Sequence, residues 1–392
     1  MVMGLKITHH NFFSDVFEQQ KGHALYTSVS NGFNHANIRL ESYGDANMPL
    51  KSHIHTFKLV PDYLKTTVTA NWRCNKVFLK EGYLADLKAS ASVDDYLKNE
   101  CKRTFRYKIQ KSVKRLQACF NITYKTFYGN NISYPTYETL MAVFHQMLKT
   151  RFEQRNDRNI ILENWEYYFN IAFNLITNKK ASLFVIFNDE EPITFTLNFH
   201  CDTILYFSVP TFHLDYAKFT PGNVAIYKIM EWCFQNNYDV FDMGYGGFEN
   251  KVNWCNARYK YEHHVLFRPK NQWGTIYTGF LNYKYQLINY LLSKNVNGMV
   301  KQLKTTIKVK KETQALPYTF LFVADLQHIK EADLVKIAIE HNNDHPLKKP
   351  LHDFLYWNTE HGTDVHVYRL NNMPQHYLFK GKKASALLQF TT

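Results

Sequence analysis

The stretch ITFTLNF, residues 193–199, constrains the fold more than any other part of the sequence. Its apolar residues alternate with Thr, Thr and Asn without exception. Strict alternation with a period of two is typical of a β-strand that is buried on one face. Two further apolar runs, residues 181–187 and 204–209, lie on either side of it, separated by the short polar segments NDEEP and HCDT. The sequence therefore predicts three consecutive strands in an antiparallel meander.

The chain continues with alternating helical and strand patterns. A loop containing TPGN leads into a helical pattern at about residues 223–235, and the apolar strand DVFDM follows. A short helical piece, FENKVNWCNA, another strand, YEHHVLF, and the amphipathic segment IYTGFLNYKYQLINYLLSK complete this block. Gly222 and the amides of the first helical turn either bind a phosphate or form an ordinary turn.

An amphipathic helix is predicted ahead of the meander. It begins at Ser92, where Asp95 gives a capping-box-like start, and its apolar residues recur every three or four positions as far as Phe120. Residues 101–126 contain no Asp or Glu, so the cations of this helix either form a solvated face or bind phosphates. These cations are Lys102, Arg103, Arg106, Lys108, Lys111, Lys114 and Arg115.

Two other segments carry secondary-structure predictions. Residues 75–87, NKVFLKEGYLADL, begin as a strand and could end in a helix. Residues 313–392 contain two strand candidates, YTFLFVAD and DVHVYRL, and a helix candidate, KEADLVKIAIEHN. No function follows from this last region. Five lysines and no acid in residues 301–311 indicate a linker or an exposed basic segment.

The charge balance narrows the classes of partner. A formal net charge of +13 favours anionic partners, namely a phosphate-bearing cofactor, nucleic acid or an anionic membrane, unless it reflects composition alone. The six cysteines form no C-x-x-C pair, and no apolar window is long enough to span a membrane. We expect reduced thiols and a cytoplasmic protein, with peripheral contact at the inner face of the membrane left open.

Searches for nucleotide, metalloprotease and hydrolase motifs find nothing. The sequence lacks G-x-x-x-x-G-K-[ST], a G-x-G-x-x-G after a strand, H-E-x-x-H and G-x-S-x-G. The HIH of residues 53–55 supplies two ligands at most, so we predict no metal site.

The order of strands and helices, together with several motifs, resembles one known fold. Residues 92 to about 267 resemble the CelD/BcsL-like branch of the GNAT acyltransferase superfamily. The motifs that carry the resemblance are CKRTFRYKIQKSVKRL, KTRFEQR, EPITFTLNF, LYFSVPTFHLDYAKFTPGNVAIYKIMEWC and FDMGYGGFENKVNW. Asn250 stands where this branch usually has Tyr. More distantly, the family is similar to Fem-type transferases, which use aminoacyl-tRNA and carry two GNAT-like units.

The resemblance implies a fold and a division into domains. The fold is α+β, with a mixed, mostly antiparallel sheet flanked by helices and a small α/β region at the C-terminus. The implied division is an N-terminal α/β region that could be a degenerate GNAT-like unit (1–91), a GNAT-like catalytic domain (92–295), a basic linker (296–312) and an accessory region (313–392).

The resemblance also implies acyl transfer from an acyl-CoA-type thioester, the co-substrate, to an amine of a small molecule, glycan or lipid. The donor's phosphates are expected at Gly222, Asn223 and Val224. Backbone N–H groups of residues 206–209, ending at Val209, are expected to stabilise the tetrahedral oxyanion. The residues expected to bind the acceptor are Arg151, Gly244, Gly246 and His263.

Asp242 is the first candidate for the base that deprotonates the amine. Burial at the end of an apolar strand should raise its pKa and Lys251 should lower it; alternatively, Asp242 only caps the glycine loop. Lys251 could pair with Asp242, bind an anionic acceptor or be a plain surface lysine. Tyr206 and Ser208 are two residues apart, which predicts one common strand face, and either could protonate the leaving thiolate.

Three functions remain open at this point. The first is an acyl-CoA-dependent N-acyltransferase in polysaccharide, cell-envelope or lipid metabolism. The second is a Fem-like transferase that uses charged tRNA. The third is a protein that binds nucleic acid or an anionic membrane and keeps the fold as a scaffold.

Overall fold

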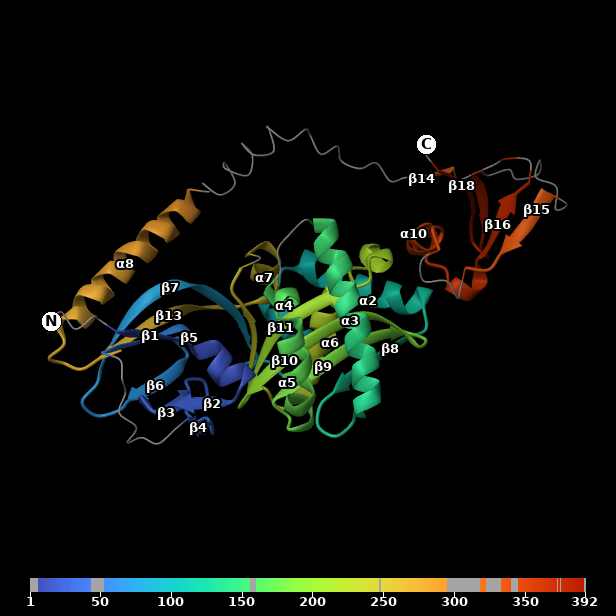
Figure 1. Ribbon diagram of the computed structural model, residues 1–392. Coiled ribbons are helices and arrows are strands. Elements are labelled where there is room, and N and C mark those ends of the chain that lie inside the picture. The colour runs from blue at the N-terminus through green and yellow to red at the C-terminus, as the bar shows by residue number, and fades with distance from the viewer. Residues whose placement is uncertain are drawn as a thin grey trace.

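The main body of the protein is built on one nine-stranded sheet (Figure 1). The computed structural model describes residues 6–43, 53–155, 160–246, 248–294, 318–321, 333–339, 345–371, 373 and 375–390. In spatial order, the strands are β1 (Ile7–Asn11), β5 (Ile54–Pro61), β13 (Ala257–Phe267), β7 (Arg73–Asp86), β12 (Val240–Gly244), β11 (Ile204–Phe212), β10 (Glu191–Cys201), β9 (Ala181–Asn188) and β8 (Ile122–Phe127).

Two pairs in this sheet, β1 with β5 and β11 with β12, are parallel, and the other six neighbouring pairs are antiparallel. The predicted meander is confirmed as β9, β10 and β11. The expected α+β class, with a mixed and mostly antiparallel sheet flanked by helices, is also confirmed.

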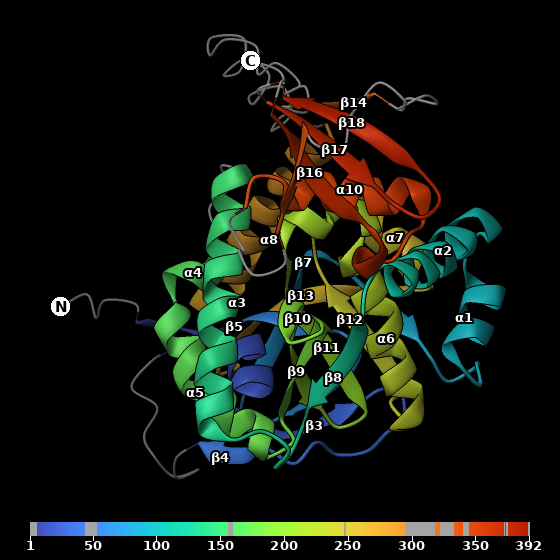
Figure 2. The ribbon, with the colours of Figure 1, turned by 90° about the vertical axis from the view of Figure 1, so that its right-hand side faces the viewer.

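Helices cover both faces of the sheet, as Figure 2 shows. On one face, α3 (Tyr134–Arg155) and α5 (Trp165–Thr177) share a core with the strands and with the N-terminal η1 (Ser14–Glu18). On the other face, α1 (Val93–Glu100), α2 (Arg103–Cys119) and α6 (Pro221–Gln235) share a second core with them. The remaining elements of this body are α4 (Ile160–Glu163), η2 (Leu214–Phe219), α7 (Phe248–Trp254) and α8 (Gln272–Ser293).

The first 91 residues contribute strands both to the main sheet and to two small sheets of their own. Their strands β1, β5 and β7 belong to the nine-stranded sheet, and β7 lies between β12 and β13. Two small two-stranded sheets complete this region: β2 (Lys21–His23) with β4 (Glu41–Tyr43), and β3 (Tyr26–Asn31) with β6 (Leu64–Val68). The helical end expected for residues 75–87 is wrong, because the extended backbone continues through Asp86 to pair with both β12 and β13.

Ser92 caps the next helix as expected, since its Oγ accepts a hydrogen bond from Asp95 N at 3.2 Å. The single helix predicted from Ser92 is, however, two helices. Cys101 has extended backbone angles (φ −111°, ψ 148°), so α1 ends there and α2 begins at Arg103.

The C-terminal region forms a five-stranded sheet with the order β14 (Tyr318–Leu321), β18 (Ser385–Phe390), β17 (His376–Lys380), β16 (His366–Leu370) and β15 (Leu334–Ile337). The helix predicted over residues 330–342 is wrong at its centre, where Leu334–Ile337 pairs with β16. Residues 330–332 and 340–342 lie outside the described residues.

The C-terminal region packs on the main body through α10 (Lys348–Asn358), which is followed by the short turn η4 (Gly362–Asp364). Two ion pairs join the parts: Lys218 Nζ lies 2.8 Å from Asp353 Oδ2, and Lys348 Nζ lies 2.7 Å from Glu191 Oε1. Both carboxylates are largely shielded from water, so these pairs fix the position of α10.

Candidate functional site

The candidate site lies where the parallel strands β11 and β12 separate. They pair only over Ile204–Tyr206 and Val240–Asp242. Beyond Tyr206, β11 continues to pair with β10, but none of its described residues pairs with β12. Crevices at the carboxyl ends of parallel strands are common ligand sites in mixed sheets.

Asp242 is the last residue of β12 that pairs with β11, and it is fully buried. Tyr63 Oη donates to Asp242 Oδ2 at 2.5 Å, and Gly244 N donates to Oδ1 at 2.6 Å. Tyr259 Oη lies 2.9 Å from both carboxylate oxygens. Burial raises the pKa of Asp242 to about 6, although the hydrogen bonds from Tyr63, Gly244 and Tyr259 oppose this rise.

The hydroxyl contacts continue from Asp242 to Tyr206. Tyr259 Oη is 2.7 Å from Tyr261 Oη, and Tyr261 Oη is 3.5 Å from Tyr206 Oη. Burial and the Asp242 charge hold the pKa of all three tyrosines far above the ordinary value. The three hydroxyls therefore stay protonated at neutral pH. Each of them can pass a proton to the next hydroxyl only if it receives another proton at the same time.

Gly82 leaves the space that this series of hydroxyl contacts needs. A Cβ on Gly82 would lie 2.2 Å from the Tyr259 ring, so the missing side chain leaves room for the ring across β7. Gly244 has a similar role in the site itself. Its φ is +65°, and a Cβ there would lie only 2.2 Å from Tyr206 Oη. Both glycines are required by close contact with a tyrosine.

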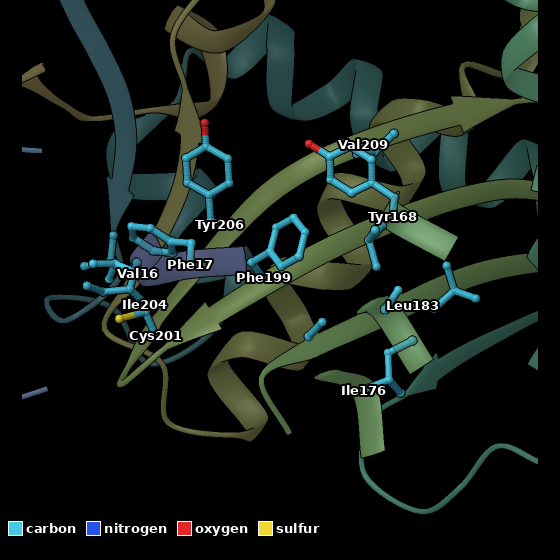
Figure 3. Packing of buried hydrophobic residues seen from close by; sticks show 14 of the residues in the cluster. Val16, Phe17, Tyr168, Ile176, Leu183, Phe199, Cys201, Ile204, Tyr206 and Val209 are labelled. Carbon is cyan, nitrogen blue, oxygen red and sulfur yellow. The ribbon is translucent and has the colours of Figure 1, made fainter. Parts of the chain in front are cut away.

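The N-terminal segment packs against Tyr206 (Figure 3). The rings of Phe13 and Phe17 lie 4.4 and 5.6 Å from the Tyr206 ring. Buried Glu18, on the same η1 turn, accepts hydrogen bonds from Ser14 Oγ at 2.7 Å and from Tyr168 Oη at 2.9 Å. Residues far apart in the chain thus enclose Tyr206.

Lys251 lies near Asp242 but binds backbone oxygens. Its Nζ donates to Met243 O at 2.5 Å and to Tyr245 O at 2.6 Å. Burial lowers the pKa of Lys251, while the Asp242 charge raises it. Lys251 therefore binds the backbone on both sides of Gly244. Gly246, in the glycine loop, has φ +75° and open space around its missing Cβ.

A bulge in β11 changes how Ser208 and Val209 are oriented. Leu197 of β10 lies opposite Val209 and Asn198 lies opposite Phe207, so Ser208 has no opposite residue. The alternation that would place Tyr206 and Ser208 on one face is interrupted here. Tyr206 and Val209, three residues apart, belong to the same core (Figure 3).

A cavity of about 740 Å³ lies between α2 and the start of α6. Thr220 and Asn223 line it on the α6 side, and Tyr356 of α10 closes it. Four cations of α2 line it as well: Arg103, Lys108, Lys111 and Arg115. The remaining residues around it are Thr104, Phe105, Tyr107, Ile109 and Ser112. The cavity therefore offers an anion several positive side chains.

The turn that opens α6 is strained. Thr220 has φ +51° and ψ 50°, which is rare for a β-branched residue, and its Oγ1 is bonded to Ser112 Oγ of α2 at 2.8 Å. Pro221 has no N–H, and the amides of Asn223 and Val224 donate to Thr220 O. A phosphate here would thus depend on the side chains of α2 more than on helix-terminal amides.

The structure places the other expected residues as follows. Val224 is buried, whereas Gly222 lies beside Phe212 at the end of β11. The Arg151 guanidinium lies 4.1 Å from the Phe212 ring centre, so Arg151 and Gly222 both lie beside Phe212. His263 is far from Asp242 along the sheet: it lies opposite Val77, and its Nδ1 is 2.8 Å from Tyr285 Oη of α8.

Three histidines form a cluster that could hold a metal ion: His10, His23 and His55. The prediction of no metal site considered only the two histidines of residues 53–55. It did not anticipate this cluster, because His10 and His23 come from β1 and β2. His10 Nε2 and His55 Nδ1 are 3.2 Å apart, a separation that fits two ligands of one tetrahedral zinc ion. Leu25 N donates to His23 Nδ1, however, which keeps the proton of neutral His23 on Nε2. Burial lowers the pKa of His10 and His23 to about 4.

Sequence reasoning missed the tyrosines around Asp242. Tyr259 and Tyr261 are two residues apart in a strand, and this spacing could have indicated a shared face toward Asp242. Tyr63 lies in the turn between β5 and β6, and local sequence carries no signal for its contact with a residue 179 positions away.

Comparisons with known proteins agree with this fold. Residues 103–261 match the family described as the acetyltransferase (GNAT) domain. No curated protein sequence matches the chain.

Among solved structures, the C-terminal domain of a putative lysylphosphatidylglycerol synthetase from Agrobacterium fabrum is 13% identical, with a TM-score of 0.38, over 54% of this chain and 67% of that one. FemX is 12% identical, with a TM-score of 0.40, over 55% and 72%. A tandem GNAT protein from the clavulanic acid biosynthesis pathway is 8% identical, with a TM-score of 0.31, over 56% and 66%. Such low similarity carries no argument about function.

The family match covers α2, the meander, α6 and β12, which are the elements that build the divergence at Asp242. The match to the acetyltransferase (GNAT) domain covers less than half of the chain, and it agrees with the GNAT-like fold expected from the sequence.

Proposed function

We propose that the protein is an N-acyltransferase that moves an acyl group from an acyl-CoA-type thioester to an amine. The observation that carries this proposal is the buried Asp242 at the divergence of β11 and β12, connected to Tyr206 by hydroxyl contacts. Since its pKa is raised to about 6, Asp242 is ionised at neutral pH and basic enough to accept a proton.

In the proposed reaction, the amine nitrogen attacks the thioester carbonyl carbon beside Tyr206. The C–N bond forms, backbone N–H groups of β11 after Tyr206 stabilise the oxyanion, and the C–S bond then breaks. The proton lost by the amine passes to Tyr206 Oη while protons shift through Tyr261 and Tyr259 to Asp242. The leaving thiolate takes up a proton from Tyr206 while the proton on Asp242 returns through Tyr259 and Tyr261 to Tyr206, so that all four groups regain their starting protonation states.

The donor's phosphates occupy the cavity between α2 and α6. Lys108 and Lys111 are exposed and line it, so they can meet a flexible anionic ligand. Arg151, beside Phe212, extends this positive charge toward the end of β11. Acetyl-CoA is the donor of first choice. The acceptor is a small-molecule, glycan or lipid amine, in keeping with the CelD/BcsL-like resemblance and a role in polysaccharide, envelope or lipid metabolism.

A second candidate function is Fem-like transfer from aminoacyl-tRNA. It is favoured by the cations of α2 that face solvent, because a row of lysines and arginines suits a nucleic-acid backbone as well as a coenzyme. The same cations would serve the third candidate, a non-enzymatic protein that binds nucleic acid through α2.

Calorimetric titration of the full chain with acetyl-CoA, longer acyl-CoAs and tRNA tests these functions. We expect saturable binding of an acyl-CoA that is weakened in the double variant K108E/K111E and kept in K114E. Lys114 lies on the same helix but does not line the cavity. Binding of tRNA alone would favour the second candidate. If Asp242→Asn retained full transfer activity, Asp242 would be only a loop cap.

A further inference from the structure

α8 carries a bare apolar stripe. Its inner face packs on β7 and β13 through Gly274, Leu281 and Tyr285, which are buried. Asn75 and Asn289 add polar contacts, Asn75 Nδ2 to Thr278 Oγ1 and Asn289 Nδ2 to Leu79 O, both at 3.3 Å. These contacts fix one side of the helix on the sheet, so its opposite side faces away from the sheet.

Large apolar side chains gather on that other side. They are between 45% and 68% exposed, and their spacing of three and four residues aligns them along the helix. We call them the outer stripe: Trp273, Ile276, Phe280, Tyr283, Leu287 and Tyr290. Figure 1 shows α8 at one edge of the molecule, at the far end from the C-terminal sheet. An apolar patch of this length on a protein surface usually marks an interaction site.

The charged residues of α8 and of the sequence directly flanking it are all positive. From His263 to Lys294 the sequence contains no Asp or Glu, whereas Lys284 lies on the helix and Arg268, Lys270 and Lys294 flank it. Trp and Tyr near the ends of an apolar stripe, with cations beside it, suit the boundary between lipid headgroups and acyl chains.

These observations favour a membrane over a second copy of this chain. Apolar residues three and four positions apart would also suit the contact between two paired helices. Such pairs, however, usually carry opposite charges beside their apolar contact. Two copies of α8 would instead bring like charges together, because the helix and its flanks offer only cations. An anionic surface removes that repulsion.

We propose that α8 lies in the interface of a membrane rich in anionic lipids and attaches the protein there by the outer stripe. Among the described residues, no helix is both long and apolar enough to cross a bilayer. The attachment is thus peripheral: the stripe enters the headgroup region and the inner face stays on the sheet. This inference does not depend on the proposed transferase activity.

Co-sedimentation of the full chain with vesicles tests the proposal. We compare phosphatidylcholine vesicles with vesicles of equal parts phosphatidylcholine and phosphatidylglycerol. The triple variant F280S/Y283S/L287S should bind the anionic vesicles at least about tenfold more weakly. Ile160→Ser is the matched control, since Ile160 is 69% exposed but lies on α4. Thermal unfolding confirms that each variant is folded, and an unchanged midpoint is expected because the altered side chains face solvent.

The outcomes separate the alternatives. Salt-sensitive binding to the anionic vesicles that is lost in the triple variant and kept in the control supports the proposal. Equal binding of both vesicle types, or binding by neither, overturns it. A dimer in light scattering that the triple variant dissociates would instead assign the stripe to a second copy.

Discussion

The Asp242 cluster and the α2 cavity handle charge in opposite ways. Asp242 is buried, and neutral hydroxyls and one backbone amide surround it. In the cavity, cations of α2 stand at the surface beside Thr220 and Asn223. Burial moves the pKa of an acid toward neutral pH, so that the acid can gain and lose a proton there. Exposed cations, in contrast, stay charged and attract anions. We therefore expect changes at Asp242 to alter rate and changes in the cavity to alter affinity.

The largest expected effect tests the first half of this comparison. Asp242→Asn keeps the shape of the side chain but removes the proton acceptor, so kcat should fall by a factor of about 10² to 10⁴. The dissociation constant of acetyl-CoA, measured by calorimetry, should stay within about twofold of the wild type. A large loss of donor affinity would contradict the separation between the two regions.

The cavity gives the next largest effect. K108E/K111E should weaken acetyl-CoA binding by about 10- to 100-fold, since two attractive charges become repulsive beside the phosphates. The variant K114E, with one reversed charge outside the cavity, should change the affinity by less than about threefold at 0.15 M salt. Equal effects of K114E and of the cavity variants would show that only the overall charge matters.

Two glycines of the same loop provide a matched pair for stability. Gly244→Ala should lower the free energy of unfolding by about 1–3 kcal/mol and reduce kcat, because its Cβ would displace Tyr206 Oη. Gly246 also has a positive φ, of +75°, but no neighbour to displace, so Gly246→Ala should cost about 1 kcal/mol and leave kcat nearly unchanged. Chemical unfolding and steady-state rates of both variants check this difference.

The pH dependence should give the smallest effect. Asp242 must be ionised to accept a proton, so kcat/KM should rise with pH through about 6 and level off above it. Tyr63→Phe removes a hydrogen bond that lowers this pKa, so the rising limb should move to higher pH. A limb that moved to lower pH, or did not move, would exclude Asp242 as the titrating group.

The sequence predicted the elements whose partners are close in the chain. The alternation in residues 193–199 and the short turns beside it were enough to predict the meander, and Asp242 followed from its position at the end of an apolar strand. Residues 334–337 were assigned to a helix because a short apolar run fits the periodicity of a helix as well as that of a strand. Only the pairing with β16 decides between helix and strand. The bulge at Ser208 was missed because it depends on the register between β10 and β11.

The contact between Tyr63 and Asp242 could not be predicted for the same reason. Tyr63 and the room above Gly82 act on Asp242 only after β5, β7 and β13 have assembled beside β12. Local propensity describes a residue's nearest neighbours along the chain, whereas the surroundings of this carboxylate depend on Tyr63, Gly82 and Tyr259 from three other segments.

The place of β7 in the sheet has a consequence for synthesis and truncation. β7 ends at Asp86, but its two neighbours are β12, which begins at Val240, and β13, which begins at Ala257. Such distant pairing slows folding, and during translation β7 must wait with both edges unpaired until more than half of the chain has been made. A fragment that begins after residue 91 would lack this strand and leave β12 and β13 each with an open edge. The nascent chain is therefore most exposed to aggregation before β13 is made.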